Sequence, residues 1–102
     1  MNKKFEARIY WLSETEGGRK KIPNGDKYAP IIQITKPLFI SDDYWSVFVM
    51  NKVVLNKNET LSNMEYLSDL APNNLAKGVE FVLYEGKRLV AKGIVLRELV
   101  RG

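Results

Sequence analysis

The chain has 102 residues, enough for one modest hydrophobic core, and its 45% content of hydrophobic residues argues against a disordered polypeptide. It contains no cysteine and no histidine, which excludes a disulfide scaffold, a thiolate metal site and the most common general base of enzymes. Sixteen Lys and Arg against twelve Asp and Glu give a net charge of +4, which keeps a small domain soluble and also favours an anionic partner.

This charge is unevenly distributed along the chain. Residues 1–40 carry eight basic and four acidic side chains, and residues 73–102 carry six and three. Residues 41–72 carry two basic and five acidic side chains, so that the middle is acidic and both ends are basic. An anionic partner would therefore meet the two ends, whereas the middle suits a different kind of contact.

The first predicted strand covers residues 3–12, where side chains alternate between apolar and polar. One face of this strand receives Phe5, Ala7, Ile9 and Trp11. A period of two residues is typical of a strand with one face in the core.

A long loop is predicted over residues 13–27, with turn signals at Gly17-Gly18 and at Pro23-Asn24-Gly25. Adjacent glycines permit a sharp reversal, because they remove the steric penalty on positive φ. Arg19, Lys20 and Lys21 follow the first turn directly, which places three cationic side chains in an exposed loop.

The middle of the chain contains two further predicted strands and one unsettled stretch. Residues 31–35 form a β-branched run, and because Ile31 and Ile32 are adjacent they point to opposite faces. A second strand covers residues 44–50 and continues through 53–55 after a turn near Asn51-Lys52. Within 56–74, residues 65–71 suit either a short helix or a polar strand.

Two strands are predicted near the C-terminus, over residues 79–84 and 88–100, joined by a two-residue turn at Glu85-Gly86. Gly93, inside the last strand, suggests a bulge or a bend at a barrel corner. Short strands joined by Gly- and Pro-rich turns predict an all-β sandwich or barrel. A closed barrel is favoured, since closure removes exposed strand edges.

Catalysis is not expected. The sequence has neither a Gly-x-Ser-x-Gly motif nor a nucleotide-binding P-loop, and Asp42-Asp43 reads as a solvated turn without further metal ligands. We therefore expect no cofactor, no metal and no bound nucleotide. The absence of a long apolar run and of a secretory signal pattern predicts a cytoplasmic protein without a membrane contact.

With these motifs in view, the chain resembles the C-terminal β-barrel domain, domain III, of elongation factor Tu and related translation GTPases. The similarity spans residues 4–36 and 72–99. It is carried by residues 4–13, Glu16-Gly17-Gly18-Arg19, Tyr28-Ala29-Pro30, Pro72, Gly78, Phe81, residues 85–88 and residues 91–95. The resemblance implies that residues 1–102 form a single, small, closed six-stranded Greek-key-type β-barrel, here free-standing.

The resemblance also implies a binding role. In elongation factors this barrel holds the backbone of the tRNA T-arm and contacts protein partners. Arg19 stands where the family has its loop arginine, Lys20 stands where the family often has histidine, and Glu85-Gly86 matches the hairpin that approaches the RNA. With Lys21, these residues form the expected RNA- or partner-binding set.

Three positions depart from the family pattern. Ala29 replaces an arginine, Ile31 replaces a glutamine, and Ala71 replaces a residue that is often basic. Because affinity follows the number of phosphates that a protein neutralises, these replacements are expected to weaken RNA binding and its salt dependence. The GTPase domain is absent from this sequence, so the resemblance implies no GTP cycle.

Three functional hypotheses remain at this stage. The first is binding of structured RNA, for which Tyr10, Trp11, Tyr44, Trp45 and Tyr84 could stack on bases if they are exposed. The second is a protein–protein interaction module, such as an inhibitor, immunity-type or regulatory protein, that uses the acidic middle. The third, least favoured, is an enzyme with an unusual carboxylate site.

Overall fold

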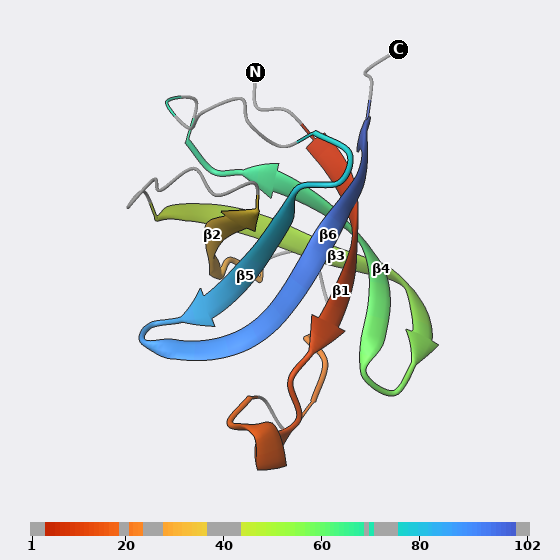
Figure 1. Cartoon of the computed structure of the whole chain (residues 1–102), viewed down its shortest axis with the longest axis vertical. Coiled ribbons are helices and arrows are strands. Elements are labelled where there is room, and N and C mark those ends of the chain that lie inside the picture. The colour runs from red at the N-terminus through yellow and green to blue at the C-terminus, as the bar shows by residue number, and fades with distance from the viewer. Residues whose placement is uncertain are drawn as a thin grey trace.

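The computed structural model describes residues 4–18, 21–23, 28–36, 44–68, 70 and 76–99. Six strands, all paired antiparallel, form a ring in the order β1-β4-β3-β2-β5-β6 (Figure 1). Their bounds are β1 Lys4–Trp11, β2 Ile31–Lys36, β3 Trp45–Asn56, β4 Glu59–Tyr66, β5 Glu80–Glu85 and β6 Arg88–Leu99, and a 3₁₀ turn, η1, covers Glu14–Glu16. Among the described residues, no helix is long and apolar enough to cross a membrane.

The prediction of an all-β, closed six-stranded barrel is confirmed. The connectivity is of the Greek-key type, because β2, β3 and β4 are sequential neighbours and β1 returns to lie beside β4. Closure comes from β6, which pairs with β5 on one side and with β1 on the other.

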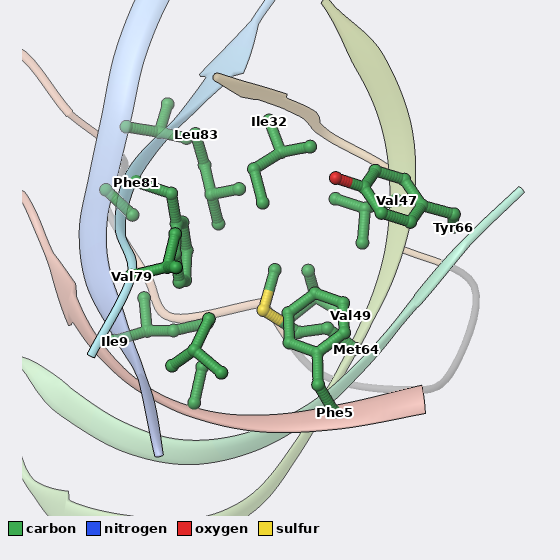
Figure 2. Packing of buried hydrophobic residues seen from close by; sticks show 14 of the residues in the cluster. Phe5, Ile9, Ile32, Val47, Val49, Met64, Tyr66, Val79, Phe81 and Leu83 are labelled. Carbon is green, nitrogen blue, oxygen red and sulfur yellow. The ribbon is translucent and has the colours of Figure 1, made fainter. Parts of the chain in front are cut away.

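The core follows from the alternation of side chains along the strands. Phe5, Ala7, Ile9 and Trp11 of β1 are at most 3% exposed, as their spacing predicts. Figure 2 shows the interior, where aromatic and branched side chains from all around the ring meet. The labelled residues are Phe5, Ile9, Ile32, Val47, Val49, Met64, Tyr66, Val79, Phe81 and Leu83.

A buried polar cluster joins three strands inside the barrel. The indole N–H of Trp11 donates to Thr60 Oγ1 at 2.9 Å, and the hydroxyls of Thr60 and Ser62 lie 3.0 and 2.6 Å from Asn51 Oδ1. The Asn51 amide N–H in turn donates to the Pro23 carbonyl at 2.6 Å. Because these groups satisfy one another, the cluster ties the loop after β1 to β3 and β4 at little desolvation cost.

Two local predictions were wrong in detail. Asn51 and Lys52 lie at a β-bulge within a continuous β3, because Asn51 stays paired with Ser62 and the register then shifts. The turn comes later, at Lys57-Asn58, and leads into β4, which occupies part of the unsettled stretch. The β5–β6 turn is Gly86-Lys87, one residue later than predicted, since Glu85 still pairs with Arg88.

Gly93 is required by close packing rather than by a bulge. Bulges in β6 occur elsewhere, where the register shifts opposite Leu83/Tyr84 and Glu6/Ala7. A Cβ at position 93 would lie 2.5 Å from Cζ of Phe81 and 2.9 Å from the carbonyl oxygen of Arg8. The missing side chain therefore makes room for the Phe81 ring between β6 and the core.

We predict that Gly93→Ala destabilises the barrel, because the added methyl group must displace the Phe81 ring and the β1 backbone. Overpacking of this kind costs about 1–3 kcal/mol, which lowers the melting temperature of a domain this size by at least about 4 °C. Thermal unfolding followed by circular dichroism measures the change. The control is Ile94→Val, at a neighbouring side chain that is 37% exposed; equal melting of the two variants would refute the packing argument.

Candidate functional site

The β5–β6 hairpin lies at the end of the barrel where β1 ends and β2 begins. Its turn depends on Gly86, whose φ of 60° is in the left-handed region that glycine adopts without strain. Glu85 accepts a hydrogen bond from the hydroxyl of Tyr28, and its Oε1 lies 3.7 Å from a guanidinium nitrogen of Arg88. Glu85 therefore braces the hairpin, whereas Gly86 and Lys87 form its tip.

A cleft of about 350 Å³ opens beside this hairpin. It is lined by Ile31, Tyr44, Tyr84, Gly86 and Lys87. The sheet register explains the grouping, because Ile31 of β2 pairs with Tyr84 of β5 and their side chains share the outer face. As predicted, the adjacent Ile32 points the other way, into the core, where it is 1% exposed.

Two tyrosines form the aromatic wall of the cleft. The rings of Tyr44 and Tyr84 meet edge-on, with centroids 6.4 Å apart and planes at 70°. The side-chain amide of Gln33 donates to the Tyr44 hydroxyl at 3.3 Å. Tyr44 remains 59% exposed, so its ring is open to a ligand although one edge is anchored.

The other candidate aromatic residues have different surroundings. Trp11 is 3% exposed and belongs to the core, which rules it out as a stacking residue. Trp45 is half-buried and packs against the same core. Tyr10 lies on the outer face, with the ammonium group of Lys92 5.5 Å from its ring centroid.

The glycine-containing loop begins with a braced turn. The Glu16 carboxylate accepts from the backbone N–H of Ser13 at 2.9 Å and from the Tyr10 hydroxyl at 3.1 Å. Gly17 has a φ of 90°, and a Cβ at Gly18 would lie 2.1 Å from the carbonyl oxygen of Leu12. Both glycines are thus required, one for its backbone angle and the other for close contact.

These hydrogen bonds shift the pKa values of two side chains, Glu16 and Tyr10. The backbone N–H of Ser13, followed by the Ser13 hydroxyl, holds the pKa of Glu16 below its ordinary value. The hydrogen bond to the same carboxylate raises the pKa of Tyr10. Glu16 is therefore an anion and Tyr10 a neutral phenol at neutral pH, so the turn is held by charge-assisted hydrogen bonds.

The predicted binding residues are only in part within the described ranges. The backbone N–H of Leu12 donates to the Val90 carbonyl at 2.9 Å, which places the start of the loop beside the β5–β6 hairpin. Lys21 and Ala29 are exposed, and Gly86 lines the cleft. Arg19, Lys20 and Ala71, like the Asp42-Asp43 pair, lie outside the described residues.

Lys87 was not part of the predicted binding set, although this residue lies at the hairpin tip and lines the cleft. Its position next to Gly86 was the available signal, since a two-residue turn exposes both of its central residues. Within the described ranges, no three His, Cys, Asp or Glu side chains gather in a way that could hold a metal ion. No family model matches the chain.

We predict that Glu16 makes the stability of the protein sensitive to acid. Because its pKa is lowered on folding, its stabilisation is present above the ordinary value of 4.5 and is lost as the pH falls through the folded-state pKa. Glu16→Gln should melt below wild type at neutral pH, and the gap should shrink in acid below pH 4.5.

Melting temperatures recorded across this pH range test the expectation. Glu14→Gln is the matched control, as this residue lies on the same 3₁₀ turn and its side chain has no hydrogen bond to another described residue. A gap between wild type and Glu16→Gln that stays constant with pH would contradict the assignment.

Proposed function

We propose that this protein is a non-catalytic binding module that holds RNA at the β5–β6 hairpin, as its resemblance to the C-terminal barrel of elongation factor Tu implies. The observation that carries the proposal is the cleft of Ile31, Tyr44, Tyr84, Gly86 and Lys87, where two aromatic rings adjoin a cationic turn. This combination suits a ligand that offers both flat apolar bases and anionic phosphates.

Each part of the cleft matches one part of a nucleotide. The open face of Tyr44 suits stacking with a base, an interaction worth about 1–3 kcal/mol. Lys87 suits a phosphate as a mobile point charge, whereas the adjacent Arg88 lies 3.7 Å from the Glu85 carboxylate, which offsets its charge. The resemblance adds Arg19, Lys20 and Lys21 to the expected binding set, and of these three only Lys21 lies within the described residues.

Ile31 alters how the RNA would be held compared with the related barrels. The resemblance implies a glutamine at this position, whereas Ile31 lines the cleft with an apolar side chain beside Tyr84. An apolar lining favours base or ribose packing over a hydrogen bond to the backbone. We therefore propose that stacking takes over part of the role of the polar contacts that the family uses, in a cytoplasmic protein that works alongside translation components.

A second candidate function, a protein–protein interaction module, is favoured by the outer face of β3. Phe48, Met50, Val53 and Leu55 form an apolar stripe along this strand, each between 38% and 48% exposed. Contiguous exposed apolar side chains of this kind are typical of protein-binding surfaces. The stripe lies in the acidic middle of the sequence, as the second hypothesis expects.

For the RNA site, we predict that Tyr44→Ala weakens binding of a fluorescently labelled tRNA transcript by about 1–3 kcal/mol, because one base loses its aromatic stacking partner. Lys87→Ala should weaken it too, and should reduce the slope of log affinity against log salt by about 0.7–0.9, because one fewer phosphate is neutralised. Fluorescence anisotropy between about 50 and 200 mM salt gives both quantities.

Lys57→Ala provides the matched control, since Lys57 is an exposed lysine in the β3–β4 turn, away from the cleft. It removes the same charge and should leave the salt slope unchanged. The proposal fails if wild-type protein shows no RNA binding at low salt, or if Lys57→Ala and Lys87→Ala lower the affinity equally.

For the protein-binding alternative, the double variant Phe48→Ser with Val53→Ser should lose any specific partner that wild-type protein captures in a pull-down, while its RNA affinity stays unchanged. Leu70→Ser is the control, because Leu70 is 85% exposed and lies outside β3. Retention of the partner by the double variant would exclude the stripe as the docking surface.

A further inference from the structure

A second hollow lies on the outer face of the barrel, next to the cleft. It has a volume of about 440 Å³, and Arg8, Tyr10, Val82, Lys92 and Ile94 are among the residues that line it. Neither the sequence motifs nor the family resemblance draws attention to this surface. It holds two cations, two carboxylates and a tyrosine, so that a cationic and an aromatic side chain occur together here as they do in the cleft at the hairpin.

The strand register links the two hollows through one row of residues. Gln33 pairs with Val82, Val82 pairs with Lys92, and Lys92 pairs with Tyr10, so that the four residues form one row across β2, β5, β6 and β1. With neighbouring strands about 4.8 Å apart, this row is about 14 Å long. Gln33 is bonded to Tyr44 of the cleft at one end, and Tyr10 ends the row at the other.

Side-chain alternation supplies the second link. Val82 and Tyr84 are two residues apart on β5 and therefore point to the same outer face, about 7 Å from each other. Tyr84 lines the cleft and Val82 lines the second hollow. A ligand that extends from the cleft over Tyr84 thus reaches Val82 on the same strand and then Lys92 on the neighbouring strand β6.

The chemistry of the second hollow suits one more nucleotide unit. The ammonium group of Lys92 lies 5.5 Å from the centroid of the Tyr10 ring, so a cation and an aromatic face are presented together. The hydrogen bond from the Tyr10 hydroxyl to Glu16 anchors this ring. Of the two carboxylates in the hollow, Glu59 is engaged by Arg8 at 2.6 Å and Glu80 lies on β5.

We propose, building on the RNA-binding function above, that the ligand is an extended single strand that runs from the hairpin cleft over β5 and β6 to Lys92 and Tyr10. This row contains Lys92, ends at Tyr10, and reaches the Tyr44 ring through Gln33 at its other end, so it suits bases that are unstacked and exposed. A duplex hides its base faces in the stack and offers mainly phosphates and sugars. The arrangement therefore selects a single-stranded segment or a loop.

Anisotropy with labelled single-stranded oligonucleotides of two lengths tests the path. A dinucleotide, about 7 Å long at about 3.4 Å per nucleotide, fills the cleft alone, whereas an oligonucleotide of about 12 nucleotides spans the row and also covers the second hollow. Lys92→Gln should weaken binding of the longer strand several-fold and reduce its salt slope by about 0.7, with little effect on the shorter one. Lys92→Arg should restore most of the affinity, and Lys4→Gln, at an exposed lysine six residues before Tyr10 at the other end of β1, should have no effect.

The outcomes separate this path from the underlying function. If Lys87→Ala weakens both oligonucleotides while Lys92→Gln changes neither, the path is overturned and RNA binding at the cleft stands. Tighter binding of a blunt RNA duplex than of the longer single strand would also overturn the path. If wild-type protein binds neither these RNAs nor the tRNA transcript at low salt, both the path and the proposed function are refuted.

Discussion

The pairing of β1 with β6 is the constraint on which the rest of this structure depends. It closes the ring, and it requires the two strands to approach closely while the Phe81 ring packs beneath them, which only a glycine at position 93 permits. Closure also removes the edges that a six-stranded antiparallel sheet would otherwise expose. The same pairing brings the loop after β1 beside the β5–β6 hairpin through the hydrogen bond from Leu12 to Val90. The candidate binding surface is thus a direct consequence of how the barrel closes.

Barrel closure also leaves two chemically different regions on the outer surface of the molecule. β3 lies across the ring from β6, so the apolar stripe of Phe48, Met50, Val53 and Leu55 lies on the other side of the ring from Lys92 and shares no lining residue with the cleft or the Lys92 hollow. One surface combines tyrosines with lysines, and the other is apolar. Because the two do not overlap in the ring, an RNA contact and a protein contact are physically compatible. Small barrels can carry several functions in this way, since their core uses only the inward half of each strand.

The sequence predicted the core better than the turns. Alternation placed Phe5, Ala7, Ile9 and Trp11 correctly, because inward side chains of a barrel strand must be apolar every second residue. It failed for β4, where Thr60 and Ser62 face inward: their hydroxyls are satisfied by Asn51 and Trp11, and no periodic rule detects such a cluster. The bulge at Lys52 was taken for a turn for the same reason, because cross-strand register is invisible in a single strand. Of the residues that line the cleft, Gly86 was indicated by the hairpin motif and Lys87 could have been, whereas the contact between Tyr44 and Tyr84 depends on the tertiary structure.

By itself, the sequence determined that this protein is built from antiparallel strands and that both ends of the chain carry a net positive charge. It also determined that no histidine or cysteine is present to act in catalysis or metal binding. These properties are local or compositional, so they can be read residue by residue. Only the tertiary structure decided which outward-facing residues become neighbours: Ile31 with Tyr84, Val82 with Lys92, and Lys92 with Tyr10. The physical reason is that strand order and register depend on the closure of the whole ring, a long-range condition that no segment of the chain contains.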